Sequence, residues 1–335
     1  MVPVIGLDVG GANTKAAVVD GDGPARTVSE PFEVWRDVRA IAGVIASVVG
    51  RLDVDGAPVA LSTTAELVDA FPNKRDGVLS VLAAAERALP GRRLRVMSTA
   101  GELVSLEAAR AAPLRCAAAN WMASALLVAR GLPDAILIDC GGTTTDVIPI
   151  SGGVVAARGR TDVERLLAGE LVYTGALRTN LAAVLSHVPI GGEPCPVSSE
   201  SFAIAADAHL LLGNLTAEQC TCTFPDGRGT SSAEVRSRLA RVVCADPEQL
   251  STGDLEAMAA AVQEAQIAAV AGALGRVAAR LGATVPVLAV GVGAFLARAA
   301  AERCGLAVDS GGASPLAGRG GEVAAAVALS VLGRE

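Results

Sequence analysis

Aromatic residues are scarce in this sequence, and their scarcity limits how a core can be built. They make up 2% of the 335 residues, and Tyr173 is the single tyrosine. Because 51% of the residues are nonetheless hydrophobic, the core must consist mainly of small aliphatic side chains. This is enough apolar material for one large domain or two medium ones.

Long uninterrupted hydrophobic runs are also missing. The most apolar windows, residues 41–50 and 116–129, fall short of the roughly 18 residues that a membrane-spanning helix needs. The chain start lacks the basic region and apolar stretch of a signal peptide, since Asp8, Asn13 and Lys15 interrupt the apolar run. We therefore expect a soluble, cytoplasmic protein with no membrane partner.

Basic residues are outnumbered, and histidines are rare. The 28 Lys and Arg face 35 Asp and Glu, for a net charge of -7, and no Lys/Arg tract is present, so a nucleic-acid partner is disfavoured. The two histidines, His187 and His209, form no H-E-x-x-H motif, and no G-x-S-x-G motif occurs. Cys220 and Cys222 lack a second pair at zinc-finger spacing, and the odd total of seven cysteines fits reduced thiols. We expect neither a structural metal site nor a Ser-His-Asp hydrolase.

What the sequence does contain is an internal repeat. The string VIGLDVGGANTKAAVV at residues 4–19 recurs in pattern as AILIDCGGTTTDVIPI at residues 135–150. In each copy an apolar strand-like run ends in Asp, a Gly-Gly pair follows one residue later, and a corner rich in Thr or Asn leads into a second apolar run. The repeated positions are Asp8, Gly10, Gly11, Asn13 and Thr14 in the first copy, and Asp139, Gly141, Gly142, Thr143, Thr144 and Thr145 in the second.

These two corners have the chemistry of an anion site. Glycines let the backbone come close to a ligand, successive N–H groups point into the concavity, and Thr hydroxyls add donors. The carboxylates of Asp8 and Asp139 would hold a hydrated Mg²⁺ against bound phosphates. The alternative is that both residues only end strands and cap turns, but their shared register in two copies favours the site.

The rest of the chain alternates strand and helix patterns. Strands are predicted over residues 57–62, 94–97 and 286–290. Helices are predicted over 78–88, 116–129, 199–212, 254–281 and 322–332, and from the GVGAF string at 291–295 to about residue 303. Residues 214–232 have no regular pattern and are predicted to form an exposed loop. The alternation predicts an α/β fold with mixed sheets.

Two phosphate corners on β-hairpins, followed late in the chain by a strand-Gly-x-Gly-helix element, resemble the superfamily of actin-like ATPases, sugar kinases and Hsp70 proteins. The resemblance implies two ribonuclease-H-like domains that flank a central cleft, with phosphates held between the two hairpins. It puts the first domain at residues 1–130, with residues 316–335 packing back onto it, and the second at 131–315. In such a fold Gly291 and Gly293 would contact the adenosine of a nucleotide.

Longer strings narrow the resemblance. DCGGTTTDV at residues 139–147 is similar to the hydantoinase/oxoprolinase branch, whose members are typically much longer. The strings GLDVGGANTK (6–15), STTAELVDAF (62–71), ANWMASA (119–125) and ELVYTGALRT (170–179) together resemble the furan-methanamine synthases of methanofuran biosynthesis. That family belongs to one-carbon transfer linked to tetrahydromethanopterin.

The narrower resemblance implies alkyl transfer and not a kinase reaction. The phenol oxygen of γ-glutamyl-tyramine, or of a tyrosine analogue, displaces diphosphate from 5-(aminomethyl)-3-furanmethanol diphosphate and forms an aryl ether. Because donation from the ring oxygen eases ionisation at the furan-methyl carbon, the protein must mainly stabilise the departing diphosphate and exclude water. Mg²⁺ is the implied cofactor, and ATP or ADP binding stays open.

The resemblance implies metal-binding and catalytic roles for charged residues in these strings. Asp8 and Asp139 would organise Mg²⁺, and Lys15 would neutralise diphosphate charge unless it is a solvated strand-end lysine. Glu66 and Asp69 lie three apart on a predicted helical turn and would share a face. Glu66 would be the general base that a phenol with a pKa near 10 needs. A solvated helix face is the alternative for such a pair.

Substrate-binding residues are expected in the same strings and on the helix predicted over 199–212. Two carboxylates seven apart on that helix would bind the aminomethyl cation of the furan. Aromatic residues would stack on substrate rings unless they belong to the core, and an arginine would pair with a carboxylate or phosphate. The residues concerned are Glu200 and Asp207 on the helix, and Asp69, Asn120, Trp121, Tyr173, Thr174 and Arg178 in the strings.

Two other function classes stay open at the level of sequence. One is an ATP-dependent enzyme, either a small-molecule kinase or an amide hydrolase of the hydantoinase type, in which the GVGAF string would contact adenosine. The other is a non-enzymatic actin-like nucleotide switch, whose self-association surfaces one sequence does not reveal. The expected partners are small-molecule substrates, and a homo-oligomer is left open.

Overall fold

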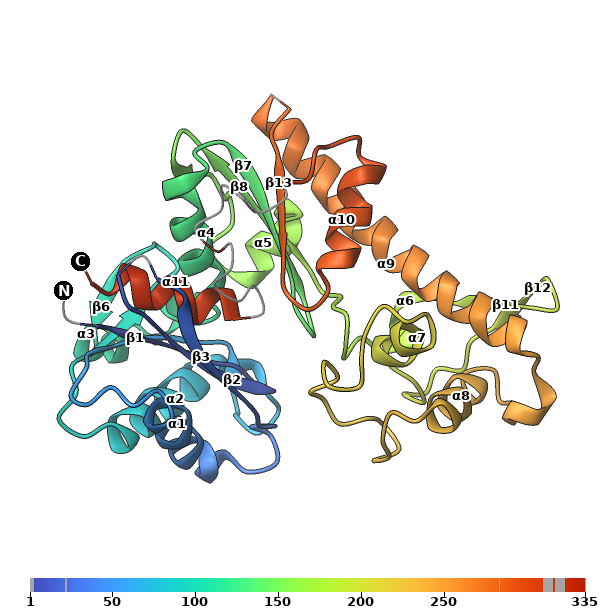
Figure 1. Cartoon of the computed structure of the whole chain (residues 1–335), viewed down its shortest axis with the longest axis horizontal. Helices are drawn as coiled ribbons and strands as arrows, with labels where there is room; N and C mark the ends of the chain where they lie inside the picture. The colour runs from blue at the N-terminus through green and yellow to red at the C-terminus, as the bar shows by residue number, and fades with distance from the viewer. Residues whose placement is uncertain (1–2, 22, 283, 310–315, 317–322, 335) are drawn as a thin grey trace. The chain divides into compact units, whose positions relative to one another are not determined.

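The chain divides into two compact units. The computed structural model describes residues 3–21, 23–282, 284–309, 316 and 323–334 (Figure 1). The first unit comprises residues 1–137, 148–168 and 309–335, and the second comprises 138–147 and 169–308. The expected boundary at residue 130 therefore lies seven residues early, and residues 148–168 group with the first unit. The predicted α/β class with mixed sheets is confirmed.

The first unit is built on a mixed sheet with the strand order β3-β2-β1-β4-β5-β6. Strand β1 pairs antiparallel with β2 and parallel with β4, and β4 runs parallel to β5. The first copy of the repeat forms the β1–β2–β3 meander, with the Gly-Gly pair at its first turn. The strands are β1 (Ile5–Val9), β2 (Asn13–Val19), β3 (Ala25–Pro31), β4 (Val59–Thr63), β5 (Leu94–Met97) and β6 (Leu103–Ser105).

Helices cover both faces of this sheet (Figure 1). Because side chains alternate along a strand, Ile5, Leu7 and Val9 all point to one face, where they are buried with residues of α1 and α2. Helix α11 packs on the opposite face, against β1, β2 and α4. The helices of this unit are α1 (Ile41–Gly50), α2 (Lys74–Ala88), α3 (Leu106–Ala111), α4 (Asn120–Gly131), α5 (Asp162–Ala168) and α11 (Ala324–Leu332), with 3-10 turns at Val38–Ala40, Ala65–Leu67 and Pro113–Arg115.

The contact between α11 and β1 is unusually close. A Cβ added to Gly6 would overlap the backbone of Ala326 and Ser330, so only glycine fits there. The buried Ser330 hydroxyl donates to the carbonyl oxygen of Val4 (2.7 Å) and accepts from the backbone N–H of Val19 (3.0 Å). The helix near the chain end is thus both packed and hydrogen-bonded onto the first strands of the unit.

The second copy of the repeat forms β7 and β8 of another sheet, which has the strand order β10-β8-β7-β13 and in which β9 pairs with β8. Residues 138–147 of β7 and β8, which include the second Gly-Gly corner, belong to the second unit. The strands are β7 (Ala135–Cys140), β8 (Thr145–Ser151), β9 (Val154–Val155), β10 (Leu171–Val172) and β13 (Val287–Val290), and a separate hairpin pairs β11 (His187–Ile190) with β12 (Glu193–Pro196).

A long helix runs through the second unit, and most other elements of the unit pack against it (Figure 1). Helix α9 (Thr252–Leu281) packs against α7, α8, α10 and β11. Among the residues described, it is the one helix long and apolar enough to cross a membrane, and half of its most apolar window is buried inside the protein. Those contacts are what a core helix makes. The other helices are α6 (Leu181–Val184), α7 (Ala205–Leu211), α8 (Ser232–Arg241) and α10 (Ala294–Arg303), with a 3-10 turn at Pro247–Gln249.

The helix predicted over 199–212 is shorter than expected. Helix α7 begins only at Ala205, because Ile204 is extended and forms a β-bridge with Asn180. The carboxylate of Asp207 accepts the backbone N–H of Ile204 (3.1 Å) and so fixes the first turn. Glu200 therefore lies outside the helix, and the prediction that Glu200 and Asp207 share a helix face is wrong.

Candidate active site

The first Gly-Gly corner is a tight turn at the carboxyl end of β1. The N–H of Gly10 donates to the carbonyl of Asn13 (3.0 Å), which closes the turn. A Cβ on Gly11 would lie 2.9 Å from Cγ1 of Val68, and one on Gly10 would lie 3.5 Å from the Thr64 hydroxyl oxygen. The corner therefore packs closely against residues 64–68, which follow β4.

Polar side chains gather on one face of the sheet beside this corner. Asp8 is 6% exposed, and its Oδ1 accepts the hydroxyl of Ser62 (2.7 Å). Asp8 is paired in register with Ser62 and with Lys15, so the three side chains point to the same face. Asn13 lies two residues before Lys15 and shares that face, whereas Thr14 is buried on the opposite one. The expectation that Thr14 contributes to the corner's ligand side is therefore wrong.

The oxygen atoms on this face suit a hydrated cation. Asn13 Oδ1 is buried and has no hydrogen-bond partner, which is a costly state that a ligand or a water-bound cation would relieve. Mg²⁺ usually keeps several waters and needs only one or two carboxylates beside phosphate oxygens. Asp8 and Asn13 fit that kind of binding. No cluster of three or more His, Cys, Asp or Glu side chains that could hold a metal by protein ligands alone occurs among the residues described.

Glu66 lies beside the first corner, on the turn after β4. It is 2% exposed, and its Oε2 accepts the hydroxyl of Thr63 (3.3 Å). Gly77 of α2 allows the burial, because a Cβ there would lie 2.6 Å from the Glu66 Cα. Loss of solvation raises the pKa of Glu66 to about 7, against the opposing effects of its backbone hydrogen bond and of the Lys74 charge. The buried carboxyl is thus poised to exchange a proton near neutral pH.

Asp69 does not share the face of Glu66. The 3-10 turn covers only residues 65–67, and Asp69 follows it as an exposed residue. The predicted pairing of the two carboxylates is therefore wrong, because a helical register does not continue past the turn. The charges that lie near Glu66 are instead Lys74 of α2 and Asp162 of α5, which form an ion pair with each other.

The second Gly-Gly corner joins β7 to β8 and repeats the first turn. The N–H of Gly141 donates to the carbonyl of Thr144 (2.9 Å), as Gly10 does to Asn13. Thr143 and Thr144 are half-buried at the corner, but Thr145 is buried and its hydroxyl donates to the carbonyl of Thr174 (2.7 Å). Thr145 therefore holds the fold together, and its predicted role as a donor to phosphate does not fit this geometry.

A short segment, residues 174–178, backs this second corner. The N–H groups of Leu177 and Arg178 both donate to the carbonyl of Gly142 (3.0 and 2.8 Å). Gly175 has no room for a side chain, because a Cβ there would lie 2.5 Å from the Thr143 nitrogen. The structure therefore brings Thr174 and Arg178 of the ELVYTGALRT string to the corner. Tyr173 precedes this segment and is 58% exposed.

The GVGAF string also meets the second corner. The N–H of Gly293 donates to the carbonyl of Cys140 (2.8 Å). Gly291 has a φ of +90°, and a Cβ there would lie 2.7 Å from Asp139 Oδ1. Both glycines are thus needed for the close approach of this turn to the end of β7. Contact with adenosine stays a prediction.

Trp121 lies in the core of the first unit, and the half-buried Asn120 precedes it. Trp121 is buried on α4, and the guanidinium of Arg165 lies over its ring, 4.1 Å from the centroid. Asn120 begins the helix, and its Oδ1 accepts the N–H of Trp121 (2.9 Å). The predicted stacking of Trp121 on a substrate ring does not fit this burial. A tryptophan in an apolar helix is a core residue here, which the sequence pattern left as the alternative.

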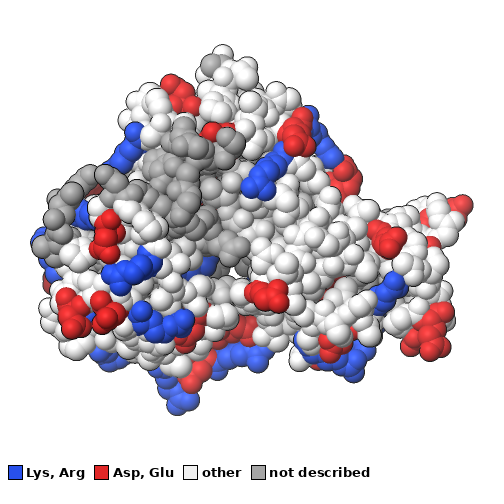
Figure 2. Space-filling view, viewed as in Figure 1, with Lys and Arg blue, Asp and Glu red and all other residues white. Residues whose placement is uncertain are grey.

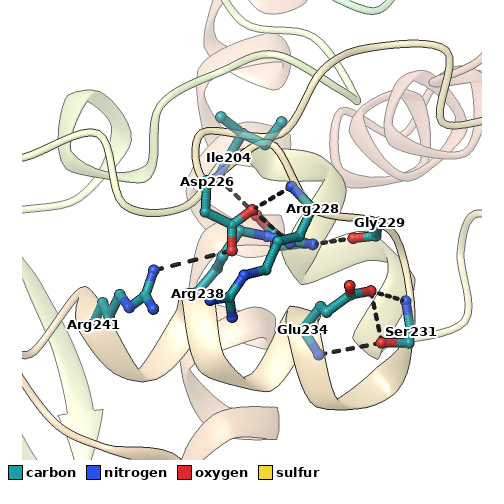
Figure 3. A network of polar contacts seen from close by, with 9 residues as sticks. Ile204, Asp226, Arg228, Gly229, Ser231, Glu234, Arg238 and Arg241 are labelled. Carbon is teal, nitrogen blue, oxygen red and sulfur yellow. Dashed lines mark hydrogen bonds and ion pairs between the residues drawn. The ribbon is translucent and has the colours of Figure 1, made fainter.

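Asp207 belongs to a buried ion-pair network with Arg238, and Figure 3 shows Arg238 together with Asp226 and Gly229. Its Oδ1 accepts Nε of Arg238 (2.8 Å), while Nη1 of Arg238 donates to Asp226 (3.1 Å) and Nη2 to the carbonyl of Gly229 (2.9 Å). Burial raises the pKa of Asp207 to about 6 despite the arginine. Asp207 thus anchors the loop at residues 214–231 and does not point toward a substrate cation, so its predicted binding role is wrong.

Charges on the surface are mixed. On the face drawn in Figure 2, acidic and basic side chains are interspersed over the coloured residues. The absence of a nucleic-acid partner stays a prediction.

Two residues near the second corner carry no motif that sequence reasoning used. Gln266 of α9 and His209 of α7 are fully buried, and Nε2 of His209 lies 2.9 Å from Oε1 of Gln266. Each lies among buried apolar residues on one face of its helix, and a polar residue in such a buried stripe was the one signal that could have found them.

Comparisons with known proteins give the context for these features. A family model described as hydantoinase/oxoprolinase matches residues 59–334. A protein of Methanocaldococcus jannaschii, named (4-{4-[2-(gamma-L-glutamylamino)ethyl]phenoxymethyl}furan-2-yl)methanamine synthase, is 36% identical over 255 residues, which cover 76% of this chain and 75% of that protein. A Methanococcus vannielii protein of the same name is 40% identical over 119 residues, which cover 36% of this chain and 53% of that protein.

Among solved structures, nucleotide-free acetone carboxylase aligns with 91% of this chain and 67% of its own length. The TM-score is 0.57 and the sequence identity is 13%, so the likeness concerns the fold alone. The expected actin-like ATPase fold is confirmed.

Proposed function

The chain belongs to the hydantoinase/oxoprolinase family and, within it, to the furan-methanamine synthases, and from this premise we propose that it forms an aryl ether in methanofuran biosynthesis. The name of the relatives describes a phenoxymethyl-furan, which contains such an ether. The main structural support for this proposal is the buried carboxyl of Glu66 beside the first Gly-Gly corner.

The proposed reaction is an alkyl transfer. The phenol of γ-glutamyl-tyramine, or of a tyrosine analogue, loses its proton, and its oxygen forms a bond to the methylene carbon of 5-(aminomethyl)-3-furanmethanol diphosphate. The bond from that carbon to the diphosphate oxygen breaks, and diphosphate leaves with the electron pair. No ATP is consumed, so the enzyme would be a transferase of alkyl groups with a diphosphate leaving group.

Glu66 is suited to accept the phenol proton. A carboxyl with a pKa of about 7 is partly ionised at neutral pH, and it is a far better match to a phenol than an ordinary glutamate. Its low exposure also keeps bulk water away from the carboxyl. The hydroxyl of Thr63 orients the carboxyl.

Each corner has donors that suit a departing diphosphate. At each, backbone N–H groups beside a Gly-Gly pair are suited to phosphate oxygens, and at the first corner Lys15 adds a positive charge on the face of Asp8. Asp8 would hold Mg²⁺ through water at the first corner, as Asp139 would at the second, and such an ion would neutralise charge that builds up on a diphosphate. Tyr173 would contact the aromatic acceptor, and we expect the reaction to occur in the cytoplasm.

A product assay tests this function. Purified protein is mixed with Mg²⁺, the furan-methanol diphosphate and glutamyl-tyramine, and the ether and pyrophosphate are followed by mass spectrometry and a coupled assay. Ether and pyrophosphate should appear in equal amounts without ATP. ADP formed from ATP with candidate acceptors, and no ether in the first mixture, would overturn the proposal.

Two variants test the residues. Glu66→Gln should slow ether formation by about 10²-fold or more at neutral pH and leave pyrophosphate binding intact. Asp69→Asn is the matched control, because Asp69 is exposed and three residues away, and its rate should stay at the wild-type level. A wild-type rate in Glu66→Gln would remove Glu66 from the mechanism.

A further inference from the structure

A buried glutamine on α9 holds the segment that backs the second Gly-Gly corner. Nε2 of Gln266 donates to the hydroxyl oxygen of Thr174 (2.8 Å) and to the carbonyl of Gly175 (2.9 Å). Both residues contact the corner in turn: the Thr145 hydroxyl donates to the Thr174 carbonyl, and Gly175 lies directly against Thr143. The position of the corner therefore depends on Gln266 through a single layer of residues.

The chemistry of the partners fixes the direction of these hydrogen bonds. The Gly175 carbonyl can only accept, so the amide nitrogen of Gln266 faces it and Oε1 faces His209. Because Oε1 can only accept, Nε2 of His209 carries the proton, and Nδ1 is left as an acceptor with Nδ2 of Asn214 3.4 Å away. Burial lowers the pKa of His209 to about 4, which keeps the ring neutral. The bonds thus run in one direction, from His209 through Gln266 to the corner.

His209 also contacts the GVGAF string. Its ring meets the ring of Phe295 edge to face, with the centroids 4.8 Å apart. The Gln266–His209 pair therefore contacts both the segment that backs the second corner and Phe295 of the GVGAF string. An apolar residue at position 266 would continue the buried stripe of α9 without the desolvation cost of an amide.

We propose that Gln266 and His209 are positioning residues that hold the second Gly-Gly corner in the geometry that receives a diphosphate. The identity of the ligand rests on the proposed function. Neither residue exchanges a proton with substrate, and their effect passes through Thr174 and Gly175. The pair keeps the backbone N–H groups of the corner pointing toward the diphosphate position. These donors therefore need not reorganise when the ligand binds.

Pyrophosphate binding tests the role of Gln266 directly. Calorimetry with Mg²⁺ and inorganic pyrophosphate is run on the wild type, on Gln266→Met and on Gln249→Met. Methionine keeps the size of glutamine and removes its donors and acceptor, and Gln249 is the matched control because it is exposed in the same unit and accepts the backbone N–H of Asp246 instead of contacting the corner segment or His209. Gln266→Met should weaken binding about tenfold or more, and Gln249→Met should leave it unchanged.

The melting temperature is measured beside each affinity. If Gln266→Met fails to fold, Gln266→Glu replaces it, since this change keeps the acceptor for His209 but sets a carboxylate oxygen against the Gly175 carbonyl. It should also weaken binding. Wild-type affinity in a folded variant at position 266 would overturn the proposal.

Histidine NMR gives a readout that general loss of stability would not imitate. The chain has two histidines, so a His187→Asn background leaves His209 as the single signal, and His187 is exposed. Nitrogen-15 spectra should show the Nε2–H form, and added Mg²⁺ and pyrophosphate should shift the signal in this background but not with Gln266→Met added. An Nδ1–H form would contradict the inferred chain of bonds.

The ether assay separates this inference from the proposed function. A wild type that binds pyrophosphate but makes no ether would overturn the proposed reaction, while the effect of position 266 on pyrophosphate would still decide the inference. A wild type that binds no pyrophosphate would overturn the inference whatever the ether assay shows.

Discussion

Glu66→Gln should make the protein more stable while it slows the reaction. The pKa of Glu66 rises from its ordinary 4.5 to about 7, which corresponds to about 3 kcal/mol at 1.36 kcal/mol for each pH unit. Between these two values the folded state binds the Glu66 proton more tightly than the unfolded chain does, so the free energy of unfolding falls as the pH rises. Above about pH 7 the whole cost of burying the charge is present.

Glutamine does not titrate, and its oxygen can still accept the Thr63 hydroxyl. The variant should therefore match the wild type near pH 4.5 and exceed its free energy of unfolding by up to about 3 kcal/mol near pH 8. The loss of activity and the gain of stability would then have one cause, because the carboxyl that serves as a base is costly to bury.

Tryptophan fluorescence is the right measurement for this prediction. Both tryptophans, Trp35 and Trp121, lie in the first unit together with Glu66, so the signal follows the unit in which the change is made. Urea unfolding is recorded at several pH values for the wild type, Glu66→Gln and the control Asp69→Asn. A stability difference that does not change between acidic and alkaline pH would refute the reasoning, because it would mean that Glu66 is not desolvated.

Three further variants test packing, the buried ion pair and substrate contact. Gly6→Ala should cost about 1–3 kcal/mol in urea unfolding because α11 leaves no room for a Cβ, whereas Gly43→Ala, at an open position of α1, should stabilise by up to about 1 kcal/mol. Arg238→Met should cost about 3–5 kcal/mol, because it leaves Asp207 buried without its partner, as measured by urea unfolding followed by circular dichroism, since the second unit has no tryptophan. Tyr173→Ala should raise the KM for the phenol substrate several-fold in the ether assay with little change in melting temperature, because the ring is exposed.

Each of these predictions has a result that contradicts it. Equal effects of alanine at positions 6 and 43 would mean that α11 does not approach β1 closely. A small loss in Arg238→Met would mean that the loop near Asp207 does not depend on the ion pair. An unchanged KM in Tyr173→Ala would remove Tyr173 from the substrate contacts.

The sequence predicted local features well where the pattern and the tertiary contacts agree. The two corners follow from the repeated Asp and Gly-Gly spacing, because a glycine pair directly after a buried strand is typical of a tight turn. Helix α9 and strand β5 match their predicted spans closely, and α4 starts four residues later than predicted. The fold class followed from the alternation of these elements.

Features that depend on distant contacts were not predictable in the same way. Helix α7 is cut short by the bridge between Ile204 and Asn180, which no local pattern reveals. Asp207 has the spacing of a surface carboxylate, and only the placement of Arg238 turns it into a core residue. Glu66 could be named from the sequence, but its raised pKa comes from burial beneath α2 at Gly77.

The bond between Ser330 and Val4 has a consequence for how the protein is made. These residues are 326 positions apart, so β1 leaves the ribosome long before the helix that covers it. Until α11 has been synthesised, the Gly6 face of the first sheet stays uncovered. The second unit can therefore fold before the first unit is complete. A nascent chain stalled before α11, or a fragment that ends with the first unit's early strands, would expose this face to chaperones and to neighbouring chains.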